Sequence, residues 1–168
     1  HLEVLALLDS KVFLQLVMAN HDGLQNSDPT IVSQCASSID HLATYIFLNM
    51  TRPKETVQRV MMHMQSDPDC FFHLMNTLFT SLLFAGGSTN HWPLTRPLLS
   101  LILISDAAYI AYRSHLSSSQ SPENQAKLDL EFTRLTENLG RSLEVTNRDK
   151  FTQRVTIFRA NVRAFMNL

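Results

Sequence analysis

The apolar residues of this 168-residue chain recur at alternating steps of three and four, and no stretch shows the period of two that marks a half-buried strand. The clearest stripe follows Asp28-Pro29 and comprises Val32, Cys35, Ile39, Leu42, Ile46 and Met50. A capping residue followed directly by proline, the combination that opens helices, recurs at Asp67-Pro68 and Ser121-Pro122. This pattern predicts an all-α chain with no sheet.

The same signals divide the chain into about seven helices. We expect these helices to begin near Leu2, Asp28, Pro53, Asp67, Thr95, Ser121 and Asn147. The polar run 86–90 is expected to end the fourth helix. The sixth helix is expected to carry its stripe through Leu139 and Leu143, and Thr146-Asn147 is expected to cap the seventh. The run 98–104 is also short and apolar enough for a buried strand, but Ala107 and Ala108 continue it as a helix to about His115.

The connections between these segments are short, which favours antiparallel neighbours. Taken in pairs, the helices recur at roughly 40 to 50 residues, close to the period of HEAT and armadillo repeats. The pattern alone is compatible with a solenoid of helix pairs and with a closed bundle.

Composition excludes several classes of protein. The chain has 14 Lys and Arg against 15 Asp and Glu, so net charge does not drive it onto nucleic acid. Its 45% hydrophobic residues exclude a disordered chain. The apolar segments fall short of the ~20 residues that span a bilayer, and Asp106 interrupts the fifth helix, so we expect no membrane partner.

No arrangement of reactive side chains predicts an enzyme. Two histidines never stand four residues apart, and neither the zinc motifs nor the phosphate-binding glycine motifs occur. Cys70 and His73 share a helix face, but their apolar neighbours favour core packing over a metal site. We therefore predict no catalytic residue, no metal and no cofactor.

Charge is concentrated on the last helix, where five basic residues stand against Asp149 alone. These five are Arg148, Lys150, Arg154, Arg159 and Arg163. They form either a solvated face that pairs with an acidic neighbouring helix or a ridge that binds an acidic protein or membrane surface. Trp92, expected to staple a loop onto the core, and Arg96, expected to pair with a carboxylate of an adjacent repeat, complete the candidate partner-binding residues.

Several segments resemble one family. They are 146–153 (TNRDKFTQ) with Phe158-Arg159, Trp92 with 95–103 (TRPLLSLIL), and 119–123 (SQSPE). Upstream, Cys35, 39–41 (IDH) and Thr44-Tyr45 fit more loosely. In order and spacing these residues resemble the C-terminal region of the exportin-7 and Ran-binding protein 17 family, which belongs to the importin-β superfamily of nuclear transport receptors.

The resemblance implies a fold and a function. It implies that residues 1–168 form the C-terminal three to four HEAT-type helix pairs of a longer right-handed solenoid. It implies a non-catalytic scaffold that binds protein cargo in cooperation with Ran-GTP and shuttles between nucleus and cytoplasm through the nuclear pore. The main Ran-binding region of such receptors lies outside this chain, and nucleoporins are a further partner class. The alternative is a stand-alone helical scaffold that binds an acidic protein or membrane surface through its basic last helix.

Overall fold

The computed structural model describes residues 2–51, 54–84 and 91–166, and within these ranges all regular structure is helical. The prediction of an all-α chain is therefore confirmed. The described helices are α1 (Leu2–Leu5), α2 (Ser10–Gly23), α3 (Pro29–Asn49), α4 (Glu55–Gln65), α5 (Cys70–Phe84), α6 (Trp92–Ile104), α7 (Asp106–Ser118), α8 (Pro122–Thr136) and α9 (Val145–Met166).

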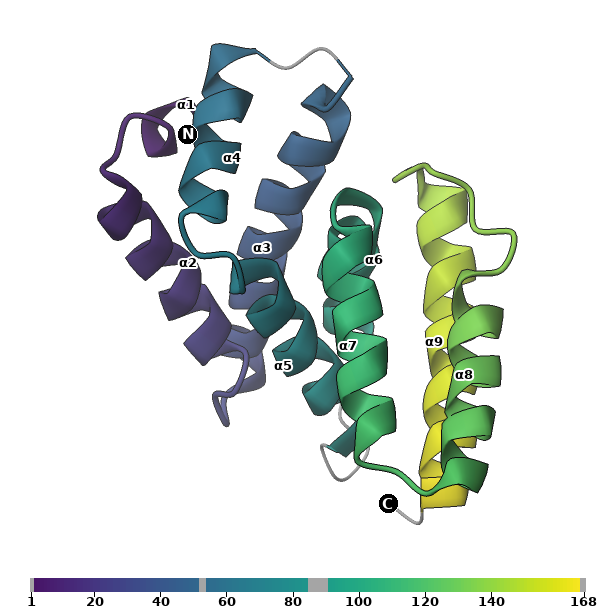
Figure 1. Ribbon diagram of the computed structural model, residues 1–168. Coiled ribbons are helices and arrows are strands. Elements are labelled where there is room, and N and C mark those ends of the chain that lie inside the picture. Colours follow the sequence, from purple (N-terminus) through teal and green to yellow (C-terminus); the bar gives the residue numbers. More distant parts are fainter. Residues whose placement is uncertain (1, 52–53, 85–90, 167–168) are drawn as a thin grey trace.

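The helices form two layers (Figure 1). In one layer α3 packs against α6, and α6 packs against α9. The other layer contains α2, α4, α5, α7 and α8, with contacts from α2 to α4, from α5 to α7 and from α7 to α8. Helices of the two layers pair as α2 with α3, α5 with α6, and α8 with α9. This stack of helix pairs is consistent with a HEAT-like solenoid.

Two cap-plus-proline signals mark real helix starts. The carboxylate of Asp28 accepts a hydrogen bond from the Thr30 amide at 2.8 Å, and the hydroxyl of Ser121 accepts one from the Asn124 amide at 3.4 Å. Each side chain satisfies an amide that has no partner within the helix. The start predicted at Pro53 and the terminator predicted at 86–90 lie outside the described residues.

Two of the seven predicted helices are each divided in the structure. The first is interrupted before Asp9, whose carboxylate caps α2 by accepting from the Lys11 amide at 2.8 Å. The fifth is interrupted at Ser105, which leaves helical geometry and accepts from the Ala108 amide at 3.3 Å, so that α6 and α7 meet at 114°. The prediction missed both because a single serine or aspartate inside an apolar run is a weaker signal than glycine or proline.

The boundary between the last two helices also differs from the prediction. Helix α8 ends at Thr136, and Asn138 adopts a positive φ of 53°, which starts the connecting segment. Leu139 and Leu143 therefore lie in this segment, where they still pack against the core. Because α9 begins at Val145, Asn147 lies inside its first turn.

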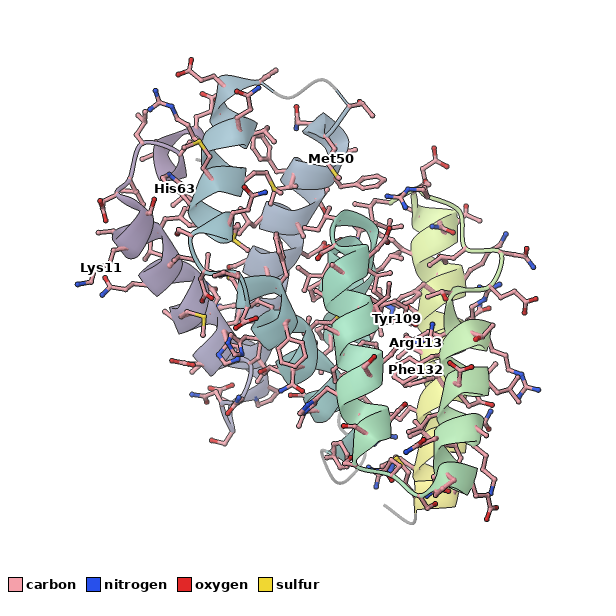
Figure 2. All side chains as sticks on the ribbon, in the orientation of Figure 1. Lys11, Met50, His63, Tyr109, Arg113 and Phe132 are labelled. Atoms are coloured by element: carbon pink, nitrogen blue, oxygen red, sulfur yellow. The ribbon has the colours of Figure 1, made fainter. Side chains whose placement is uncertain are left out.

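An aromatic cluster unites the C-terminal helices. Phe79 of α5 stacks on Tyr112 of α7 with ring centroids 4.4 Å apart, and Phe132 of α8 meets Phe158 of α9 at 5.0 Å. Arg113 covers this seam, with its guanidinium carbon 5.6 Å from the centre of the Phe132 ring (Figure 2). The cluster fixes the positions of α7, α8 and α9 relative to α5.

In the described part of the chain, α6 and α7 reach the length and apolar composition of a membrane span only when taken together as a bent pair, and no single helix does so.

Candidate protein-interaction surface

Helix α9 carries the five basic residues that the sequence singles out, and the structure divides them into different environments. The side chain of Arg148 is only 11% exposed, whereas Lys150 is exposed. The remaining three arginines are partly exposed and donate hydrogen bonds to backbone carbonyls of other segments. The five residues therefore do not form one uniform ridge.

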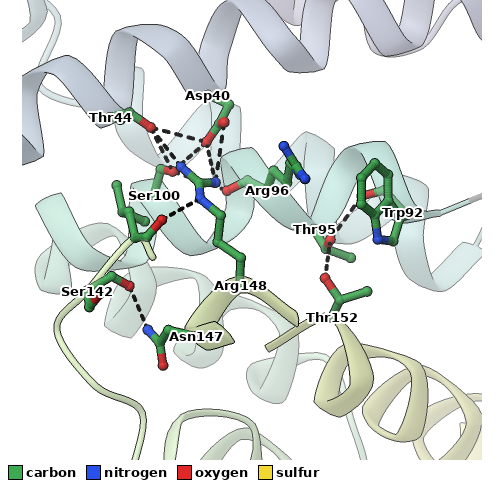
Figure 3. Close-up of polar contacts among 11 residues, drawn as sticks. Asp40, Thr44, Trp92, Thr95, Arg96, Ser100, Ser142, Asn147, Arg148 and Thr152 are labelled. Carbon is green, nitrogen blue, oxygen red and sulfur yellow. Dashed lines mark hydrogen bonds and ion pairs between the residues drawn. The ribbon is translucent and has the colours of Figure 1, made fainter. Parts of the chain in front are cut away.

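Arg148 forms a buried ion pair with Asp40 of α3 (Figure 3). One terminal nitrogen of Arg148 donates to both Asp40 oxygens, at 3.0 and 3.3 Å, and the other donates to the Thr44 hydroxyl at 3.0 Å. Ser100 of α6 donates to the same carboxylate at 2.5 Å. We call Asp40, Thr44, Ser100 and Arg148 the inter-repeat clamp, because these residues join the three helices of one layer.

The geometry of the inter-repeat clamp suits a structural role. Its carboxylate and guanidinium satisfy each other away from solvent, so neither charge is presented to a partner. The Arg148 Nε also donates to the Leu143 carbonyl at 2.9 Å, which ties the segment before α9 to the same point. Arg148, predicted as a partner-binding residue, thus lies within an internal network.

Asn147 holds the segment between α8 and α9. Its side-chain amide donates to the carbonyl of Gly140 at 2.7 Å and to that of Ser142 at 2.6 Å (Figure 3). The predicted role as a helix cap is wrong, because the residue already lies inside α9 and its side chain points back to the preceding segment.

Two arginines of α9 bind the C-terminal end of α5. Arg159 Nε donates to the Leu82 carbonyl at 2.7 Å, and Arg163 donates to the Leu83 carbonyl at 2.5 Å. The last carbonyls of a helix lack partners within the helix and carry partial negative charge, so guanidinium groups stabilise this end. Arg154 similarly donates to the Glu137 carbonyl, just after α8.

Trp92 and Arg96 form a pair on α6. Trp92 begins the helix and is 48% exposed, and the guanidinium carbon of Arg96 lies 4.5 Å from the centre of its ring. Trp92 therefore begins a helix instead of standing in a loop, and its side chain is about half exposed. Arg96 was expected to pair with a carboxylate, but within the described residues it forms no ion pair and stacks on Trp92 instead.

A hydroxyl contact positions this pair relative to α9. The Thr95 hydroxyl lies 2.8 Å from that of Thr152 and donates to the Trp92 carbonyl at 2.9 Å (Figure 3). Thr95 is buried and faces α9, whereas the side chains of Trp92 and Arg96 on the same helix are exposed to solvent.

The side chains considered for metal binding lie apart. Cys70 is fully buried in α5, and its burial, aided by the charge of Asp67, raises the pKa of its thiol to about 12. His73 is exposed. The thiolate that binds metals is therefore disfavoured at Cys70. Among the described residues no three His, Cys, Asp or Glu side chains gather as a metal site would require.

Sequence reasoning missed the role of Asp40, which does not belong to the apolar stripe of α3. The reason is that α3 packs on two sides, with Ala36, Asp40 and Ala43 buried in addition to the stripe. A signal for the clamp did exist, since Ser100 is the lone polar residue in the run 98–104. A buried hydroxyl requires a hydrogen-bond partner, and that partner is Asp40.

Comparison with known proteins gives matches along the whole chain. The chain is 31% identical to Exportin-7-B of Xenopus laevis over 99% of its length, and 31% identical to Ran-binding protein 17 of Mus musculus over 96%. Exportin-7 of Dictyostelium discoideum is 23% identical over 93% of the chain. The chain spans 16% of the length of these curated relatives. No family model and no solved structure matches it.

Proposed function

This chain is homologous over 96–99% of its length to a segment of exportin-7 and Ran-binding protein 17, and we propose that it is part of a nuclear transport receptor that binds protein cargo together with Ran-GTP. In this proposal the chain is a non-catalytic scaffold that shuttles between nucleus and cytoplasm. It does not bind nucleic acid or membranes, and nucleoporins are a further partner class. The main contact with Ran lies outside residues 1–168.

The observation that carries this proposal is the extent of the match. The match with 31% identity covers 99% of the chain, so it includes all three helix pairs and the segments that connect them. A chance likeness between amphipathic helices would follow the apolar stripes and would not extend over every connection.

We further propose that residues 1–168 form the C-terminal segment of the receptor's solenoid. The N-terminal edge, formed by α1, α2 and α4, exposes large apolar residues that are 43–73% accessible: Val4, Leu7, Val12, Leu16 and Met62. Such an edge suits stacking against another helix pair. The C-terminal edge, formed by α8 and α9, carries a hydrogen-bonded polar network around Glu131 and also exposes Leu130, Val145 and Ile157.

The proposal is tested with the full-length receptor and a version that lacks this segment. Protein cargo captured by each would be compared on immobilised receptor with Ran loaded with GTP or with GDP. We expect the deletion to reduce GTP-dependent cargo affinity by about tenfold or more, which corresponds to about 1.4 kcal/mol. A circular-dichroism melt of the shortened receptor serves as the control for folding.

Unchanged GTP-dependent capture by a folded, shortened receptor would contradict the proposal. If the shortened receptor also captures cargo unchanged, binding of an acidic protein or vesicle by the 168-residue chain alone would instead support the stand-alone scaffold.

A further inference from the structure

Two arginines of α9 and one histidine meet beside the end of α5. Arg159 and Arg163, one turn apart on α9, are anchored on the consecutive carbonyls of Leu82 and Leu83. His91, which directly precedes α6, lies near both guanidinium groups, since their charges contribute to its titration. The backbone anchors hold the two guanidinium groups side by side, although like charges repel.

The pKa directions agree with this crowding. Burial lowers the pKa of His91 below its usual value, and the charges of Arg159 and Arg163 lower it further. Burial also lowers the pKa of Arg159, with a further contribution from Arg163. Positive potential therefore persists here, although the partial negative charge of the α5 carbonyls offsets part of it.

The Trp92–Arg96 pair extends this region along α6. Trp92 follows His91 directly and is 48% exposed, and Arg96 stacks on the indole one turn later. An aromatic ring beside several cations offers apolar contact area together with bidentate donors, and Trp and Arg are enriched at binding hot spots. We call Trp92, Arg96, Arg159 and Arg163 the α6–α9 basic surface.

We propose that the α6–α9 basic surface binds an acidic segment of a partner protein, with carboxylates on Arg96 and Arg163 and an apolar side chain against Trp92. This proposal rests on the scaffold role proposed above, but it requires neither Ran nor cargo identity. It also narrows the candidate residues, because Arg148 belongs to the inter-repeat clamp and Lys150 lies at the opposite end of α9.

The small number of cations on this surface favours an acidic protein segment over nucleic acid as its ligand. Nucleic-acid binding sites neutralise several phosphates along a track of cations, and their net charge is strongly positive. The chain as a whole has a formal net charge of -1, and only three arginines and one indole form this surface. A short cluster of Asp or Glu residues matches that number of donors.

The test measures binding of a fluorescein-labelled glutamate-rich peptide with one central phenylalanine to the 168-residue chain by fluorescence anisotropy. The same peptide with glutamine at every glutamate is the uncharged control probe. We expect Arg163→Gln and Arg96→Glu each to weaken binding by about tenfold. Trp92→Ala is expected to weaken it by about threefold.

Matched variants separate this surface from general charge attraction. Lys150→Gln removes an exposed cation from the same helix and should change affinity less than twofold. Arg163→Lys keeps the charge but loses the planar pair of donors, so it should weaken binding less than Arg163→Gln does. Because Arg163 also anchors α5, Arg96→Glu provides a second test at a side chain that forms no ion pair within the described residues.

Three outcomes would overturn the proposal. These are no binding of the acidic peptide, an equal loss with Lys150→Gln, or tighter binding of a single-stranded oligonucleotide with the same sensitivity to Arg96→Glu. Each leaves the transport proposal intact, since neither Ran nor cargo is present in the assay.

Discussion

The two edges of the stack differ in their exposed surfaces and in the contacts that attach them to the other helices. The N-terminal edge exposes an apolar surface, and hydrogen bonds of histidines supplement its packing against the core. His63 of α4 donates from Nε2 to the Ala6 carbonyl at 3.3 Å (Figure 2). Its Nδ1 accepts from the Ser10 hydroxyl at 2.8 Å. The Phe13 ring lies 5.0 Å from the same imidazole.

The C-terminal edge combines a polar network with exposed apolar side chains on its surface, and its attachment includes charged groups. Glu131 of α8 accepts from Arg134 at 2.8 Å and from Asn161 of α9 at 3.0 Å, and the exposed Leu130 and Ile157 lie among these groups. The inter-repeat clamp attaches α9 to α3 across α6. The contrast teaches that both edges expose large apolar side chains, whereas the inter-repeat clamp gives the C-terminal edge a buried ion pair in its attachment.

The largest expected effect comes from breaking the clamp. Arg148→Ala should lower the free energy of unfolding by about 3–5 kcal/mol, because it leaves the Asp40 carboxylate buried without its counter-charge. Urea unfolding measures this loss, and Lys150→Ala, an exposed change on the same helix, should stay within about 0.5 kcal/mol. The double variant Asp40→Leu/Arg148→Met should recover much of the stability. A loss below about 1 kcal/mol in the single variant would show that the clamp does not hold the C-terminal edge.

Alkaline pH should weaken the region beside each edge through a different buried group. Burial raises the pKa of Cys70 and that of Tyr109 to about 12. Cys70 begins α5, next to α4, and the Tyr109 hydroxyl donates to the Phe132 carbonyl of α8. The unfolded thiol loses its proton near 9.0, whereas the folded thiol keeps it, so stability is complete below pH 9 and falls as the pH rises toward 12.

For Cys70 the expected loss is about 2 kcal/mol between pH 9 and about pH 10.5. Cys70→Ala should flatten this part of the pH dependence, and Tyr109→Phe should act only above about pH 10. Unfolding free energies across this range give the two slopes separately. Identical slopes in all three proteins would contradict the assignment.

The smallest expected effect comes from loosening the N-terminal edge. His63→Ala removes two neutral hydrogen bonds and the contact with Phe13, so it should lower local stability by about 1 kcal/mol. Native-state hydrogen exchange should become about fivefold faster in α1 and α2 and stay unchanged in α8 and α9. Faster exchange in both edges would show that they open together.

The sequence predicted the helical architecture well because its signals are local. The stripe from Val32 to Ile46 and the caps Asp28 and Ser121 each act within a few residues, and all lie where they were expected. The breaks at Asp9 and Ser105 escaped prediction because each depends on one short polar side chain whose choice between cap and helix interior is decided by packing.

The candidate site was less predictable because charge on a helix does not reveal what lies opposite. Arg148 and Arg163 follow the same pattern in the sequence, yet one meets a buried carboxylate and the other meets helix carbonyls. The partner of Arg148 is 108 positions away, and no local rule connects the two residues. Trp92 could have been assigned to the surface only if the stacking position of Arg96 had been recognised.

The 108 positions between Asp40 and Arg148 have a consequence for biosynthesis. A ribosome adds residues at about 5–20 per second, so Asp40 emerges roughly 5 to 20 s before Arg148. During this interval the nascent α3–α6 unit contains a carboxylate whose final counter-ion has not yet been made. The contact between α3 and α6 is therefore expected to reach its full stability only when the last helix arrives.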